Sequence, residues 1–117
     1  VSATYIQSPD YPNSYPDNMH CTYDIISNYG NINLDFSSFE LEASDGCKKD
    51  WIKIYEGSIS NDTLVQTRCG NDTAPYITTA LRVFIVFRSD MAVASKGFRI
   101  GYKCKSMLHL PGEQGRN

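Results

Sequence analysis

Residues 39–57 read Phe-Glu-Leu-Glu-Ala-Ser-Asp-Gly-Cys-Lys-Lys-Asp-Trp-Ile-Lys-Ile-Tyr-Glu-Gly. Apolar and acidic residues alternate over the first positions, and a second alternating run covers residues 51–55. Alternation with a period of two is typical of a half-buried β-strand. Because the Ser44-Asp45-Gly46 turn between the two runs is followed by Cys47, the stretch predicts two strands joined by a loop that a cysteine anchors.

The rest of the chain contains similar short runs, separated by turns rich in Gly, Pro, Asn and Asp. The further expected strands are 1–6, 21–25, 32–36, 64–68, 81–87 and 98–102. Residues 81–87 are apolar on both faces, which indicates a central strand buried between two layers. The only tryptophan, Trp51, is expected to pack in or beside the core. Since no segment sustains helical periodicity, the pattern predicts an all-β fold, a two-sheet antiparallel β-sandwich.

A chain of 117 residues has the length of one domain. We expect this domain at 1–104 and a C-terminal tail or linker at 105–117, where no strong pattern remains. A formal net charge of −2 disfavours nucleic-acid binding, which usually requires a basic surface. The longest apolar run, Val83–Phe87, is far too short to insert into a membrane.

Four cysteines are widely separated, at Cys21, Cys47, Cys69 and Cys104. They form no Cys-x-x-Cys pair, and the two histidines do not complete a zinc pattern, so disulfides formed in an oxidising compartment are the better interpretation. Two N-glycosylation sequons begin at Asn61 and Asn71. Together these features predict a secreted or extracellular glycoprotein.

Several spaced motifs follow one another in a fixed order. They are Ile6-x-Ser8-Pro9-x-Tyr11-Pro12-x-x-Tyr15-Pro16, Cys21, Leu34-x-Phe36-x-x-Phe39-x-Leu41-Glu42, Cys47-x-x-Asp50-x-Ile52-x-Ile54-x-x-Gly57, Cys69-Gly70, Phe87-x-Ser89-Asp90 and Gly97-Phe98-x-x-x-Tyr102. In this order they resemble the CUB domain of extracellular proteins, over nearly the whole domain. The resemblance implies a compact jelly-roll sandwich of two antiparallel sheets, stapled by disulfides.

The resemblance also implies a disulfide pairing, with one departure. It pairs Cys47 with Cys69. Family members usually begin with a cysteine that bridges to the position of Cys21, and that residue is missing here. We therefore expect a Cys21–Cys104 bridge, and the alternative is a free Cys21.

Many CUB domains bind Ca²⁺ through one Tyr, one Glu and two Asp, and the matching residues here are Tyr15, Glu42, Asp50 and Asp90. In the family a main-chain carbonyl also binds the ion, and here it would belong to Ala92. The chemistry is coherent, because calcium takes about six to eight oxygen ligands and clustered carboxylates repel one another without a cation. Tyr15 would act from outside the ligand set, by hydrogen-bonding a carboxylate.

The resemblance further implies that such calcium-organised loops bind an exposed Lys or Arg of a protein partner. The expected contact residues are Tyr15, Glu42, Asp50, Asp90 and Met91, with Val93 also at the apolar rim. Met91 and Val93 would then surround a charged pair, and such a pair is strong only where water is excluded.

Three other classes of function are alternatives: catalysis, glycan binding and a purely structural spacer within a mosaic protein. Catalysis is disfavoured, because no nucleophile elbow occurs and neither histidine has an evident acidic partner. A glycan- or glycosaminoglycan-binding module, as in some CUB-like seminal proteins, is the leading alternative. Its sequence support is limited to the small basic pairs Lys48-Lys49 and Lys103-Lys105, and sulfated-sugar binding there is expected to be salt-sensitive and independent of calcium.

Overall fold

The computed structural model describes residues 4–28, 31–91 and 94–104, with the side chain of residue 104 left out. Its strands are β1 (Thr4–Gln7), β2 (His20–Ile26), β3 (Ile32–Glu40), β4 (Trp51–Glu56), β5 (Leu64–Arg68), β6 (Tyr76–Thr78), β7 (Arg82–Arg88) and β8 (Gly97–Cys104), with short 3-10 turns η1 (Asp45–Cys47) and η2 (Asn61–Thr63). Within these residues no helix has the length and apolar character that a membrane crossing needs. The expected tail, 105–117, lies outside the described residues.

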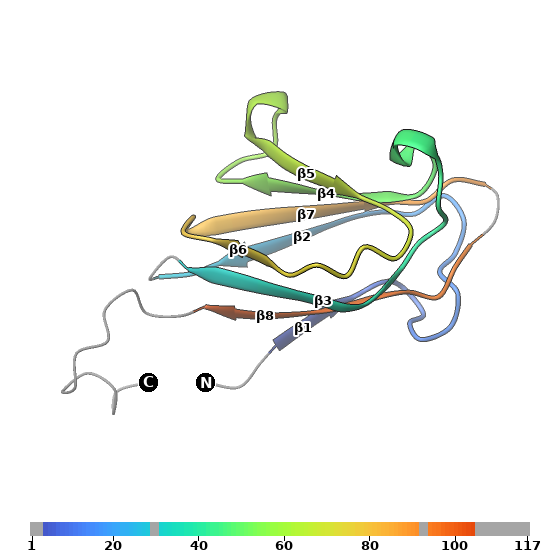
Figure 1. Cartoon of the computed structure of the whole chain (residues 1–117), viewed down its shortest axis with the longest axis horizontal. Coiled ribbons are helices and arrows are strands. Elements are labelled where there is room, and N and C mark those ends of the chain that lie inside the picture. The colour runs from blue at the N-terminus through green and yellow to red at the C-terminus, as the bar shows by residue number, and fades with distance from the viewer. Residues whose placement is uncertain (1–3, 29–30, 92–93, 105–117) are drawn as a thin grey trace.

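The strands form two antiparallel four-stranded sheets that face each other (Figure 1). One sheet has the order β1-β8-β3-β6 and the other β2-β7-β4-β5. This confirms the predicted two-sheet sandwich. The end at which β3, β5 and β7 finish and β2, β4 and β8 start is called the loop pole, and it lies on the right in Figure 1.

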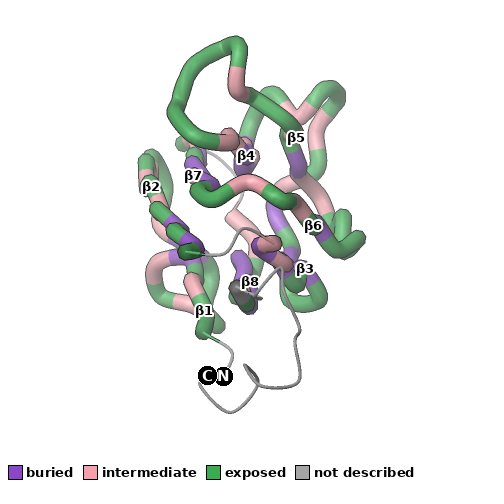
Figure 2. The backbone as a smooth tube through the Cα atoms, turned by 90° about the vertical axis from the view of Figure 1, so that its left-hand side faces the viewer, coloured by how far each residue is buried: buried purple, intermediate pink, exposed green. Residues whose placement is uncertain are grey.

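The core lies between the sheets, because alternate side chains of each strand point inward. In β3 the inward residues Ile32, Leu34 and Phe36 are almost completely buried, and in β8 Phe98 and Ile100 are 0% exposed. Figure 2 shows buried positions toward the space between the sheets and exposed ones around the outside.

A β-bulge in β3 changes which residues face the core. The pairing register with β8 shifts between Asp35 and Ser38. Without this shift, strict alternation after Phe36 would point Glu40 inward. With it, Phe39 and Leu41 are buried and Glu40 is exposed, so the strand delivers its last apolar residues to the core just before the loop pole.

Two expectations for the strands need correction. β7 is an interior strand, as predicted, but among the described residues no second layer packs on its outer face. Val86 is 5% exposed there, whereas Phe84 is only half-buried, with the guanidinium of Arg82 4.7 Å from its ring centroid. The prediction that β7 is apolar and buried on both faces is therefore correct for Val86 and wrong for Phe84. β6 was not predicted, because its three residues are too short for an alternating pattern.

The disulfide expectations have different outcomes. Cys47 and Cys69 are bonded, with their Cα atoms 5.5 Å apart, as predicted. Cys21 carries a free thiol, so the predicted Cys21–Cys104 bridge is wrong. Cys21 is the second residue of β2, at the loop pole, whereas Cys104 ends β8 opposite Ile32, at the other pole. Because β2 and β8 start at the same pole, Cys21 at the start of β2 and Cys104 at the end of β8 lie at opposite poles, and they also belong to different sheets, so the two residues are too far apart to be bridged.

Arg68 is a charged side chain on the inner side of β5. It is 3% exposed, and its guanidinium carbon lies 4.0 Å from the ring centroid of Phe36. The guanidinium donates hydrogen bonds to Gln66 Oε1 and to the carbonyl oxygen of Ala74. Arg68 therefore covers Phe36 at the edge of the core and fixes the loop that follows β5.

We predict that Arg68→Ala lowers the free energy of unfolding by about 2–4 kcal/mol, because it removes the hydrogen bonds to Gln66 and Ala74 and opens a void over the buried Phe36. Urea unfolding followed by fluorescence measures this change. The matched control is Arg99→Ala, since Arg99 also stacks on a ring, that of Tyr5 at 4.1 Å, but on the exposed face. Equal losses in the two variants would contradict a structural role for the buried guanidinium.

Candidate metal centre

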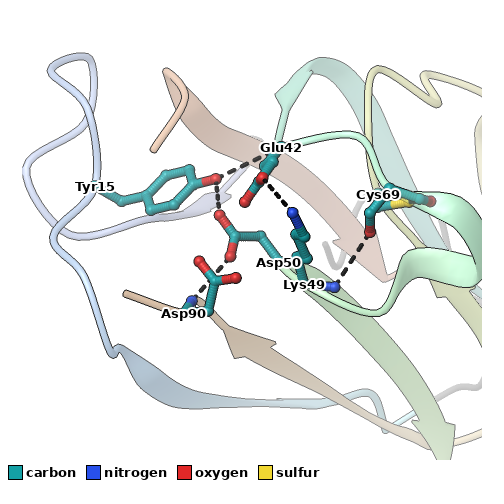
Figure 3. A network of polar contacts seen from close by, with 7 residues as sticks. Tyr15, Glu42, Lys49, Asp50, Cys69 and Asp90 are labelled. Atoms are coloured by element: carbon teal, nitrogen blue, oxygen red, sulfur yellow. Dashed lines mark hydrogen bonds and ion pairs between the residues drawn. The ribbon is translucent and has the colours of Figure 1, made fainter. Parts of the chain in front are cut away.

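The loop pole gathers three carboxylates from separate segments (Figure 3). Glu42 follows β3, Asp50 immediately precedes β4, and Asp90 follows β7. One carboxylate oxygen of each lies within 4.8 Å of those of the other two. Residues that are far apart in sequence therefore form one acidic cluster.

Asp50 is the centre of this cluster, and its side chain is 0% exposed. Its Oδ2 accepts a hydrogen bond of 2.5 Å from the Tyr15 hydroxyl, and its Oδ1 accepts one of 2.9 Å from the backbone N–H of Asp90. The backbone N–H of Glu42 donates to the same Tyr15 hydroxyl at 3.2 Å. Tyr15 thus connects two members of the cluster from outside it, as Figure 3 shows.

Tyr15 is positioned by the loop between β1 and β2. Its ring is 2% exposed and packs edge-on against Phe87, with centroids 5.2 Å apart. Its backbone N–H donates to the carbonyl oxygen of Ser95 at 3.3 Å. Gly97 is required beside this loop because its φ is +96° and a Cβ there would lie 2.0 Å from the Ser8 Oγ.

Ser89 is a supporting residue whose role sequence reasoning missed, although it lies in the Phe87-x-Ser89-Asp90 motif. It is 3% exposed, and its hydroxyl donates to the carbonyl oxygen of Pro16 at 2.9 Å and accepts from the N–H of Met19 at 2.8 Å. Because Asp90 is the next residue, Ser89 ties the segment that carries this carboxylate to the Tyr15 loop.

The electrostatics of the cluster favour a cation. Burial raises the pKa of the Asp50 carboxyl, and the hydrogen bonds from Tyr15 and Asp90 only partly oppose this. Burial also raises the pKa of the Tyr15 hydroxyl, which therefore stays protonated and remains a donor. The Lys49 ammonium lies 3.8 Å from Glu42 Oε2, at the rim of the cluster.

A cation ligand set needs oxygen atoms that the protein itself does not satisfy. Within the part of the chain that the structure describes, Glu42 Oε1 is the buried side-chain oxygen without a hydrogen-bond partner. A buried, unpartnered carboxylate oxygen is unfavourable unless a ligand compensates it. The residues present therefore fit a hard cation such as Ca²⁺, which prefers oxygen ligands.

The remaining predicted site residues are placed as follows. Met91 follows the cluster directly and is 78% exposed. Ala92 and Val93 lie outside the described residues, so the expected carbonyl ligand stays a prediction. The sequon residues Asn61 and Asn71 are exposed, and their glycosylation also stays a prediction.

Comparisons with known proteins give one consistent result. A sequence model described as the CUB domain matches residues 1–102. Cubilin of Rattus norvegicus is 36% identical over 105 residues, which cover 88% of this chain and 3% of cubilin. The chain spans 19% or less of the curated relatives that it matches first.

Solved structures with the same fold include a MASP-1 CUB2 domain bound to Ca²⁺. It is 34% identical with a TM-score of 0.75, and the match covers 87% of this chain and 92% of that one. The full extracellular region of zebrafish Gpr126/Adgrg6 is 31% identical with a TM-score of 0.75, and the match covers 88% of this chain and 14% of that one.

The buried Asp50 carboxyl predicts a pH dependence in calcium-free protein. Because its pKa is raised in the folded state, the fold binds more protons than the unfolded chain between the ordinary Asp value of about 3.9 and the raised value. Stability then falls as pH rises through that window. We expect Asp50→Asn to remove this contribution, so that the free energy of unfolding of the variant rises relative to that of the unsubstituted protein as the pH rises above the ordinary Asp value of about 3.9.

Urea unfolding in the presence of a chelator, repeated across this pH range, measures the effect. Glu40→Gln is the control, since Glu40 is an exposed acid at the loop-pole end of β3. A difference between Asp50→Asn and the unsubstituted protein that does not change with pH would contradict the interpretation.

Proposed function

The chain belongs to the CUB domain family, and from that premise we propose that it is an extracellular protein-interaction module whose calcium-organised loops bind an exposed Lys or Arg of a protein partner. CUB domains are non-catalytic modules, so any catalytic activity of a longer parent protein would belong to another part of it. The observation that carries the proposal is the unpartnered, buried Glu42 Oε1 in a cluster of three carboxylates.

Calcium is the cation that we propose for the cluster. Glu42, Asp50 and Asp90 would hold it, the carbonyl of Ala92 would complete the protein ligands, and Tyr15 would orient Asp50. When bound, the ion neutralises the repulsion among the carboxylates and holds three loops at fixed distances. The similarity to a MASP-1 CUB2 domain bound to Ca²⁺ supports this choice.

A basic side chain of a partner fits the same pole. Glu42 and Asp90 are only partly buried, and a Lys or Arg of the partner would approach their carboxylates from outside. The protein's own Lys49 already places an ammonium 3.8 Å from Glu42. Exposed Met91 beside the cluster offers apolar contact that would exclude water around such a pair.

An extracellular location is part of the proposal. A disulfide closes the loop between Cys47 and Cys69, and disulfides persist in oxidising compartments. Both sequon asparagines are exposed, as glycan attachment requires. One of the similar solved structures is the full extracellular region of zebrafish Gpr126/Adgrg6.

Glycan binding remains the second candidate. The acidic cluster would repel sulfated or sialylated sugars, so such a ligand requires a separate basic surface. Lys48, Lys49 and Arg88 line such a surface beside the cluster.

We predict that calcium raises the melting temperature and gives a saturable calorimetric signal. A ligand present at a hundred times its Kd stabilises the native state by about 2.7 kcal/mol. Asp50→Ala and Asp90→Ala should abolish both effects, whereas the control Asp45→Ala, an exposed acid in η1 outside the cluster, should retain them. The absence of heat and thermal shift at millimolar calcium would end the proposal.

A pull-down from native extracellular fluid, with and without a chelator, tests the partner class. The partner should be retained only with calcium, and acetylation of its lysines or competition by free lysine should weaken retention. Equal retention by the Asp50→Ala variant would show that the partner binds elsewhere.

A further inference from the structure

A second polar site lies beside the acidic cluster, at the loop pole on the outer face of the β2-β7-β4-β5 sheet. It is a hollow of about 260 Å³, and we call it the basic hollow. Its lining includes Asn18, Lys48, Lys49, Trp51, Arg88 and Asp90. The proposed calcium-dependent contact with a partner does not use Lys48, Trp51 or Arg88.

The strand register explains how the hollow forms. Trp51 begins β4 and Arg88 ends β7, and these residues are direct cross-strand neighbours. Their inward-pointing neighbours Ile52 and Phe87 are fully buried, so Trp51 and Arg88 point to the outer face. Lys48, in the loop that precedes β4, also lines the hollow.

The cations of the hollow are available for a ligand. Lys48 and Arg88 are exposed, and neither forms an ion pair within the described residues. Lys49 has its distant contact with Glu42 at 3.8 Å. The Lys53 ammonium lies 4.4 Å from the centroid of the Trp51 ring and adds a further positive charge next to the hollow. The chain as a whole has a formal net charge of −2, so this concentration of positive charge is confined to the hollow and its surroundings.

The chemistry of the hollow combines separated positive charges with an aromatic wall. Trp51 is half-buried with Lys53 over its ring, so a sugar would pack on the part of the indole that Lys53 leaves accessible. A sugar ring presents apolar C–H groups that pack on an indole, and sulfate groups accept hydrogen bonds from Lys and Arg. An acidic protein segment would use the cations but would leave the indole without a matching surface.

We propose that the basic hollow is a binding site for a sulfated glycan, with Lys48 and Arg88 binding sulfate groups and Trp51 packing against a sugar ring. Its only acidic lining residue among those described is Asp90, which the hollow shares with the acidic cluster. Calcium in the cluster would offset the charge of Asp90 and weaken the attraction of Lys49 to Glu42. Contrary to the expectation from sequence, glycan affinity should therefore rise with calcium, and this part rests on the proposed calcium site.

The test uses a heparin octasaccharide as the probe, with its affinity measured by calorimetry at low and physiological salt. The unsubstituted protein should bind it, more tightly at low salt. The double variant Lys48→Ala/Arg88→Ala should lose roughly tenfold in affinity, as expected for the loss of two exposed charge contacts. The control Arg99→Ala/Lys103→Ala removes the same charge from exposed positions of β8 on the other sheet and should bind normally.

Two further measurements identify the ligand class. Trp51→Ala should weaken octasaccharide binding, while thermal unfolding checks that the variant is folded. If poly-glutamate of equal charge binds as tightly, and Trp51→Ala has no effect, the hollow is a site for acidic protein segments and the glycan proposal is wrong. Loss of binding in the control pair equal to that in the double variant would likewise overturn it.

The calcium dependence is measured separately. The octasaccharide affinity should increase several-fold when calcium replaces a chelator, and Asp50→Ala should lack this increase. No increase in a protein that binds calcium by calorimetry would refute the coupling. A protein that binds no calcium would refute the proposed function, while the comparison of variants in chelator would still decide the glycan site.

Discussion

A carboxylate buried at the end of a sandwich is the constraint on which the loop pole depends. Asp50 is fully buried, and an ionised carboxylate in such a place is costly unless hydrogen bonds or charges compensate it. Its compensation comes from the loop before β2, through Tyr15, and from the segment after β7, through the N–H of Asp90. Three segments that have no sequence proximity are therefore held together by one side chain at the start of β4.

The rest of the pole restrains these segments from outside. The Cys47–Cys69 disulfide connects the loop before Asp50 to the end of β5. Ser89 connects the segment after β7 to the Tyr15 loop. Since each restraint acts on the backbone beside a carboxylate, the acidic residues are preorganised before any cation is present. Preorganisation of this kind lowers the entropic penalty of binding.

The alternation of apolar and polar residues was sufficient to predict which residues of most strands face the core, because burial of one face of a strand determines which of its residues are apolar. It could not show where long-range pairing places strand ends, and this is why the Cys21–Cys104 bridge was wrong. The acidic cluster was found through motif resemblance rather than periodicity. The buried position of Arg68 at the edge of the core was not predicted. The prediction that Trp51 packs in or beside the core was wrong, because Trp51 alternates with the buried Ile52 and therefore faces outward, under Lys53.

The basic hollow was invisible in sequence for a geometric reason. Arg88 lies far from Lys48 along the chain, and only the pairing of β4 with β7 makes it a neighbour of Trp51. The same pairing places the hollow next to Asp90, so sites of opposite charge share one residue. In such an arrangement a change of charge in the cluster must alter the potential in the hollow, because Asp90 belongs to both and salt screens charges only beyond about 8 Å at physiological ionic strength. The two surfaces are therefore electrostatically coupled by the fold itself, whichever ligands they bind.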